Sequence, residues 1–175
     1  MSQCYRLHSL HLCAVSDHPT ARHLLHRTLR YKGAEAISAP EAVDATLDFR
    51  VEREAASPPE DARHRDLGEH FGIDVWTTSD RMILRRGDTT VELHPEAGVA
   101  EAAIAPDLLD ESSNQSGRSL VCYLGALSLA TLLRSRGWFP LHAAALVHKG
   151  RGVLITARSG SGKSTAALSL VRNGW

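Results

Sequence analysis

The segment from Ala157 to Thr165 contains the residue types that phosphate binding requires. Its sequence, ARSGSGKST, matches the P-loop pattern GxxxxGK[ST], with Ala157 in the place of the first glycine. Alanine is close to glycine in size, so this replacement needs little additional room. Gly160 and Gly162, which allow the backbone to curl around an anion, are both present. The segment therefore predicts a loop that binds nucleotide phosphates.

The position of each residue in the loop predicts its role. Backbone N–H groups from about Gly160 to Thr165 would form a concave nest for the α- and β-phosphates, reinforced by the positive end of the following helix. Lys163 would contact the β/γ oxygens, the Ser164 hydroxyl would be a ligand of Mg²⁺, and Thr165 would touch the α-phosphate. The expected cofactors are ATP and Mg²⁺. The predicted cofactor-binding residues are Ala157, Ser159, Gly160, Ser161, Gly162, Lys163, Ser164 and Thr165, and Ser164 is also the predicted metal ligand.

The elements that must position this loop are predicted from the flanking sequence. The β-branched run 153–156 predicts a strand before the loop, and residues 166–173 predict a helix after it. Further upstream, residues 119–136 have the three- and four-residue apolar spacing of a helix, which Gly137 would end. Residues 141–147 predict a strand and 149–152 a turn. A hairpin, and not a βαβ crossover, is therefore expected to lead into the loop.

The N-terminal part of the chain is predicted to be rich in strands. Residues 4–15 predict one strand, and Asp17 and Pro19 predict the start of a helix, with Asp17 as its cap. A charged loop is expected over 53–70. The remaining predicted strands are 46–52, 73–78, 81–86, 89–94 and 99–104, of which the last four form an antiparallel meander without catalytic residues.

Two regions follow from this pattern, separated at 105–118, where periodicity is lost. Residues 1–118 are expected to form an antiparallel, β-rich α+β region with one helix. Residues 119–175 are expected to form the start of an α/β domain, with a helix, a hairpin and the P-loop.

Composition limits the classes of protein that the chain can represent. It has 175 residues, 43% of them hydrophobic, and 20 basic residues balance 20 acidic ones, so no basic face for nucleic acid is expected. We expect no membrane segment and a cytoplasmic protein. The three cysteines contain no CxxC pair, which argues against a disulfide framework, and the spacing of Cys4, His8, His11 and Cys13 matches no familiar zinc site.

From about Ser119 onward, the chain resembles the HPr serine kinase/phosphorylase family, and especially its shorter, divergent bacterial relatives. The similarity covers Leu141-His142-Ala143, the predicted hairpin, Val153 to Thr156, the loop Ser159 to Ser164, and the segment from Ala167 to Gly174. The family similarly has a Leu-His-Gly or Leu-His-Ala strand start, a short hairpin, a P-loop and a helix ending in Arg-x-Gly.

The resemblance implies a P-loop kinase core of the kind also seen in phosphoenolpyruvate carboxykinase. Such enzymes transfer the γ-phosphoryl group of ATP, with Mg²⁺, to a serine hydroxyl of a protein. His142 corresponds to a family histidine close to the phosphate site and is the candidate catalytic residue; a core histidine on a buried strand is the alternative. The family's acidic residues lie in an Asp-Asp stretch after the P-loop helix, and this sequence ends at Trp175, before such a stretch. We therefore expect an incomplete core, from a longer protein or a truncated gene product, that binds phosphate without turnover.

Two other interpretations remain open. An ATP-binding-cassette ATPase has a similar loop and an adenine-stacking aromatic residue upstream, for which Trp138 and Phe139 lie at about the right distance. A non-catalytic regulatory or peptide-binding module would instead use the strand-rich region and retain a vestigial P-loop. The expected partners are a nucleotide, a protein or peptide phosphoacceptor and, in a homo-oligomer, a second copy of the chain.

Overall fold

The computed structural model describes residues 2–51, 53–66, 72–110, 115–158 and 160–175. The fold is mixed α/β and divides into two compact units, one extending to Trp138 and the other from Phe139 to Trp175. We describe each unit by itself.

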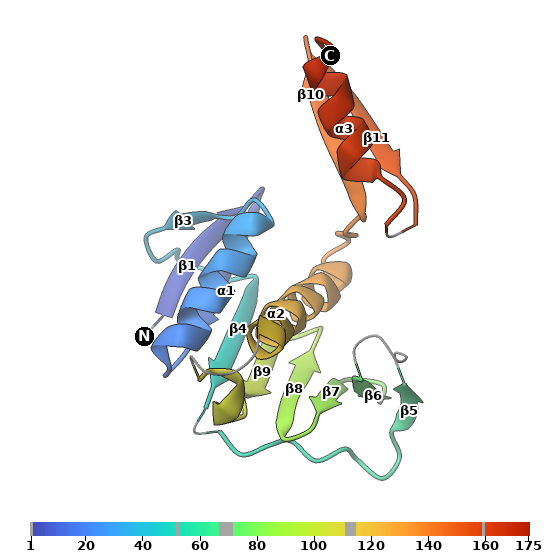
Figure 1. Ribbon diagram of the computed structural model, residues 1–175. Helices are drawn as coiled ribbons and strands as arrows, with labels where there is room; N and C mark the ends of the chain where they lie inside the picture. The colour runs from blue at the N-terminus through green and yellow to red at the C-terminus, as the bar shows by residue number, and fades with distance from the viewer. Residues whose placement is uncertain (1, 52, 67–71, 111–114, 159) are drawn as a thin grey trace. The chain divides into compact units, whose positions relative to one another are not determined.

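The first unit contains a nine-stranded sheet and two α-helices (Figure 1). Its elements are β1 (Ser2–Leu7), β2 (Leu10–Val15), α1 (Pro19–Tyr31), β3 (Glu35–Ile37), β4 (Ala45–Arg50), β5 (Arg63–Asp66), β6 (Asp74–Thr77), β7 (Met82–Arg86), β8 (Thr89–His94), β9 (Val99–Ala103), the short 3-10 helix η1 (Pro106–Leu108) and α2 (Gln115–Ser135). The second unit consists of β10 (Ala143–His148), β11 (Arg151–Thr156) and α3 (Lys163–Arg172).

The large sheet is mostly antiparallel, with strand order β3-β1-β2-β4-β9-β8-β7-β6-β5. Only the β2–β4 and β4–β9 pairings are parallel among the described strands. The predicted meander is confirmed as β6 to β9, whose successive pairings are antiparallel. The prediction of one strand over 4–15 was wrong, because His8 adopts φ 55° in a two-residue turn and folds the segment into the β1–β2 hairpin. Strand β5 lies within the segment that was predicted to be a loop.

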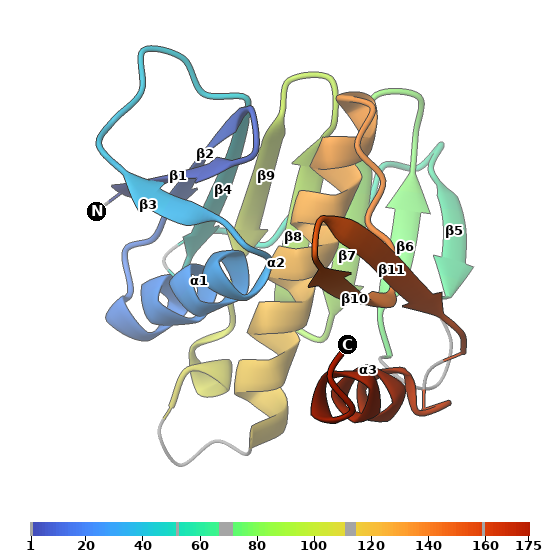
Figure 2. The same ribbon diagram turned by 90° about the horizontal axis from the view of Figure 1, so that it is seen from above.

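One face of the sheet carries the hydrophobic core. Helices α1 and α2 both cover this face (Figures 1 and 2). In the central strands β2, β4 and β9, alternate residues are buried, as expected for a sheet with one covered face. Ala14, Leu47, Ala100 and Leu93 are successive register partners across β2, β4, β9 and β8, and all four are buried. Phe49 extends the same face along β4 and is also buried.

The opposite face of the central strands carries a row of carboxylates. Asp48, Glu101 and Glu92 are register partners across β4, β9 and β8. Like charges directly opposite one another destabilise a sheet, so counterions are needed. Arg53 supplies one by contacting both Asp48 (2.8 Å) and Glu101 (3.3 Å), and Arg81 pairs with Glu92 at 2.7 Å.

The division between the units differs from the expected boundary at 105–118. Helix α2 belongs to the first unit, because its apolar side chains, including Leu120, Val121 and Leu124, are buried in the core of the large sheet. Gly125 permits the close approach of α1, since a Cβ atom there would lie 3.1 Å from Leu25 Cδ2. The boundary between the two units therefore lies after the end of α2.

The predicted C-terminal end of α2 agrees with the structure, whereas the predicted N-cap of α1 does not. Gly137 follows α2 with φ 79°, and Trp138 N donates to Leu133 O, which completes a Schellman motif and confirms Gly137 as the stop. The prediction of Asp17 as the cap of α1 was wrong. His18 is the N-cap and accepts from Thr20 N through Nδ1, while Asp17 Oδ1 accepts from Val51 N across the unit.

Substituting Gly98 should test the junction between β4 and β9. This residue has φ 72°, and an added Cβ would lie 2.4 Å from Asp44 O. We expect Gly98→Ala to lower the free energy of unfolding by about 1–3 kcal/mol more than Gly87→Ala, because of the added overpacking. Gly87 is the matched control, since its φ is 57° but a Cβ would meet nothing within 4 Å. Urea unfolding monitored by circular dichroism measures both values, and equal losses would contradict the observed junction.

The β1–β2 register predicts that Cys4 and Cys13 can be joined. They are direct cross-strand partners with their Sγ atoms 3.9 Å apart, and such pairs have Cα separations that a disulfide can span. With oxidised glutathione, the Sγ–Sγ bond should form as two thiol protons leave and two electrons reduce one glutathione disulfide to two thiols. Mass spectrometry should detect an intramolecular product lighter by two hydrogens, which Cys13→Ser cannot form.

The rate of this closure should increase with pH. Burial raises the pKa of Cys13 to about 11, so its thiolate, the reactive form, is scarce near neutrality and becomes more abundant as the pH rises toward that value. Closure that is absent at alkaline pH, or that yields only intermolecular dimers, would contradict the register.

Candidate functional site

The second unit has the strand, loop and helix order that a P-loop requires. Strands β10 and β11 form an antiparallel hairpin in which Leu146 pairs with Val153 and Ala144 with Ile155. Helix α3 packs on the hairpin, and Ala167 is its buried apolar residue. The predicted hairpin, loop strand and loop helix are therefore all present. The loop of residues 157–162 connects the end of β11 to the start of α3.

Two glycines give the loop its curvature. Gly160 and Gly162 have φ values of 76° and 84°, in the left-handed region that residues with a Cβ adopt at a cost. Gly162 is also the N-cap of α3 and provides no side chain to its first turn. Ser161 closes the bend, because its Oγ donates to Arg158 O at 2.7 Å.

The side chain of Lys163 lies along the inside of the loop. Its Nζ donates to Ala157 O at 3.0 Å and to Arg158 O at 2.9 Å, and the residue is 9% exposed. These acceptors are neutral carbonyls, so among the described residues no carboxylate neutralises the ammonium group. The loop therefore presents a fixed positive charge that is partly removed from water.

The first turn of α3 adds hydrogen-bond donors. The first bond into the helix runs from Ala166 N to Gly162 O at 2.8 Å. The N–H groups of Lys163, Ser164 and Thr165 precede it, and in the part of the chain that the structure describes they have no acceptor, as is usual for the first turn of a helix. Such donors, together with the helix dipole, favour an anion.

Two hydroxyl residues of the predicted phosphate site lie in the first turn of α3. Ser164 and Thr165 are both exposed, which leaves their hydroxyl groups accessible. Ser159 lies outside the described residues. No group of three or more His, Cys, Asp or Glu residues that could hold a metal ion occurs among the residues described. The role of Ser164 as a ligand of Mg²⁺ stays a prediction.

His142 lies at the end of the hairpin that carries the loop. It directly precedes Ala143, the register partner of Thr156, and Thr156 directly precedes the loop. His142 is exposed and lies outside β10, so the alternative of a core histidine on a buried strand was wrong. Its catalytic role stays a prediction.

Trp138, one of the two aromatic residues considered for adenine stacking, stacks on a histidine instead. Trp138 belongs to the first unit, where its ring stacks on His8 with centroids 5.1 Å apart and an interplanar angle of 15°. This contact does not favour the ATP-binding-cassette interpretation.

Comparisons with known proteins do not assign the chain to a family. No family model, curated protein or solved structure matches it. The resemblance to HPr serine kinases thus stays a hypothesis based on the loop, the hairpin and His142. Separately, none of the described helices is long and apolar enough to cross a membrane.

The sequence did not predict what holds the loop closed. The acceptors for Lys163 are the backbone carbonyls of Ala157 and Arg158, and every residue has a carbonyl. No side-chain signal at these positions could have identified them.

Replacing Lys163 with methionine should open the loop. The variant keeps an unbranched side chain but loses both bonds to the loop carbonyls, and charged hydrogen bonds contribute about 1.5–3 kcal/mol each. We expect trypsin to cleave after Arg158 at least about a hundredfold faster in Lys163→Met, because cleavage follows the population of the open loop. Lys149→Met, in the exposed hairpin turn, is the control and should cleave at the wild-type rate. Equal rates in all three proteins, measured by mass spectrometry, would show that Lys163 does not restrain the loop.

Proposed function

We propose that the second unit binds the phosphates of ATP, with Mg²⁺, in the loop of residues 157–165. The observation that carries this proposal is the position of Lys163, folded inside a loop whose two glycines have positive φ. The helix after the loop begins with N–H groups that have no acceptor among the described residues. Positive charge and convergent backbone donors are the features that a phosphate chain requires.

The residues present fit the phosphate groups. Lys163 can transfer its hydrogen bonds from neutral carbonyls to phosphate oxygens, which are stronger acceptors because they are charged. The N–H groups of the first turn of α3 can donate to the same anion. The absence of side chains at Gly160 and Gly162 lets the phosphates approach the backbone closely.

Magnesium would be held chiefly by the nucleotide. The Ser164 hydroxyl is the protein ligand that we assign, and phosphate oxygens and water would complete the octahedral set that Mg²⁺ prefers. Bound in this way, Mg²⁺ would neutralise part of the phosphate charge.

The type of reaction is supported by the resemblance to the HPr serine kinase family. In that case the nucleotide donates its γ-phosphoryl group to a serine hydroxyl of a protein. His142 is exposed at the loop end of the hairpin, where it could contact the phosphates or the acceptor hydroxyl. Phosphoryl transfer also needs an acidic contact to Mg²⁺ and a group that orients the hydroxyl, and we assign neither to a described residue.

Nucleotide binding should be measurable as local protection. We expect Mg-ATP to slow amide hydrogen exchange over residues 160–165 and to raise the thermal unfolding temperature of the wild-type chain, since a ligand stabilises the state that binds it. Both effects should be lost in Lys163→Ala and retained in Lys149→Ala, which removes an equal charge from the exposed turn of the same hairpin.

Two results would contradict the proposal. One is protection of the wild type and of Lys163→Ala to the same extent, which would place the nucleotide elsewhere. The other is a complete lack of protection in the wild type, which would favour a vestigial loop.

A further inference from the structure

The groove between α1 and α2 is a second candidate site, separate from the loop of residues 157–165 that we propose to bind phosphate (the phosphate loop). It consists of two adjoining hollows that share Arg27, and we call it the helix groove. One hollow has a volume of about 380 Å³ and is lined by Arg27, Thr28, Tyr31, Lys32, Cys122, Tyr123 and Ala126. The other has a volume of about 340 Å³ and is lined by Pro19, Thr20, His23, Leu24, Arg27 and Arg118.

The charge of the helical layer has a single sign. From Pro19 to Lys32 the chain contains three arginines, two histidines and a lysine, and from Gln115 to Arg136 it contains three arginines. Neither segment contains Asp or Glu, although the whole chain is formally neutral. The acids of the central strands lie on the other face of the sheet, where they pair with Arg53 and Arg81. The helix groove therefore lies in a field that attracts anions.

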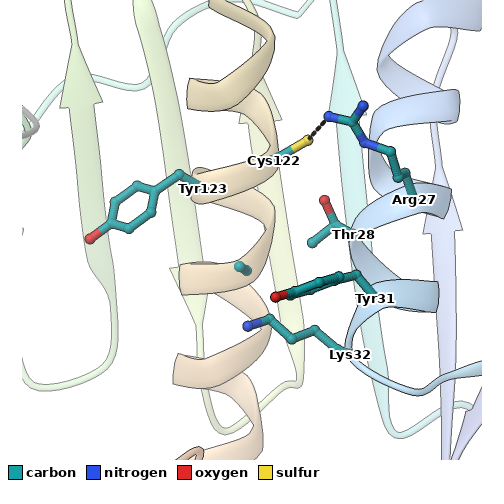
Figure 3. A pocket seen from close by; sticks show the side chains of 7 residues that line it. Arg27, Thr28, Tyr31, Lys32, Cys122 and Tyr123 are labelled. Atoms are coloured by element: carbon teal, nitrogen blue, oxygen red, sulfur yellow. Dashed lines mark hydrogen bonds between the residues drawn. The ribbon is translucent and has the colours of Figure 1, made fainter. Parts of the chain in front are cut away.

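Two arginines of the helix groove, Arg27 and Arg118, have N–H groups that are available to bind an anion. Arg27 contacts Cys122 Sγ at 3.4 Å, and thiol sulfur is a weak acceptor (Figure 3). Arg118 Nε is shielded from solvent and has no hydrogen-bond partner among the described residues. A shielded donor without a partner is unfavourable, and an oxyanion at this position would provide the missing acceptor.

The two hollows differ in polarity. The Arg27–Arg118 hollow is lined about equally by polar and apolar atoms, whereas the hollow beside Tyr31 is lined mainly by apolar atoms. The Tyr31 ring projects over the groove next to the ammonium group of Lys32 (Figure 3), and Tyr31 is 85% exposed. A ligand that spans the groove would thus present an apolar group at one end and negative charge at the other.

The length and openness of the groove favour a peptide over a small molecule. Helix α1 has 13 residues and is about 20 Å long. An extended peptide covers that length with about six residues. A small ligand in a site this open would keep much of its surface in water, unlike ligands in enclosed pockets. From these observations we propose that the helix groove binds an acidic peptide segment that carries an apolar side chain beside its carboxylates.

Arg27 and Tyr31 have separate tasks in this interaction. The guanidinium group of Arg27 lies where the two hollows meet and would pair with a carboxylate, bidentately where geometry permits. The ring of Tyr31 would cover the apolar side chain of the peptide. Neither residue belongs to the core, so substitution of either should leave the fold intact.

Fluorescence anisotropy can test the proposal with the full chain and no nucleotide, so the result does not depend on the phosphate loop. The probe is a labelled peptide of about eight residues, with two leucines followed by glutamates. We expect Arg27→Ala to weaken binding about fivefold or more, and Arg30→Ala less than about twofold, since Arg30 has the same charge on the same helix but does not line the groove. Tyr31→Ala should weaken binding of this probe but not of a probe with alanines in place of the leucines.

Circular dichroism should show the same helix content in all variants. Equal weakening by Arg27→Ala and Arg30→Ala would indicate non-specific attraction and overturn the assignment. Equal binding of a probe with glutamines in place of the glutamates would do the same. Tighter binding of an oligothymidine strand, with the same dependence on Arg27, would assign the groove to nucleic acid instead.

Discussion

The first unit depends on the burial of one face of its large sheet by α2. The side chains of Leu47, Phe49, Ala100 and Leu93 form a continuous apolar surface on one face of the sheet. The hydrophobic effect therefore requires a second layer, and α1 and α2 supply it. This requirement explains why α2 belongs with strands that precede it in the chain. It also explains why Gly125 lies where the two helices approach each other.

One-sided burial also separates the charges of this unit. Core-facing positions cannot hold carboxylates, so Asp48, Glu92 and Glu101 lie on the opposite face and depend on Arg53 and Arg81 there. The solvent side of the helices is left to arginine, lysine and histidine. The charges of the chain sum to zero, but the acidic residues lie on one face of the first unit and the basic residues of the helices on the other. The composition of the whole chain could not indicate this separation.

Local signals predicted more of this structure than long-range ones. The meander, the loop hairpin, the strand-loop-helix order of the second unit and Gly137 as a helix stop follow from alternation, tight turns and glycine chemistry, which act over a few residues. The hairpin over 4–15 was missed because its turn contains no glycine, proline, asparagine or aspartate, and the positive φ falls on His8 instead. The cap of α1 was misassigned because Asp17 bonds to Val51, far along the chain. The helix groove was not predicted, since it forms only where α1 meets α2.

The exposed face of the β10–β11 hairpin has a consequence for the loop of residues 157–162. Val147 and Leu154 lie on this face and are 79% and 60% exposed, so the second unit buries little apolar surface of its own. Units of this size have few contacts to offset their chain entropy. The anion binding that we propose for this loop would then supply a large share of the energy that keeps the unit folded. Folding of the unit and occupancy of the loop would behave as one coupled equilibrium.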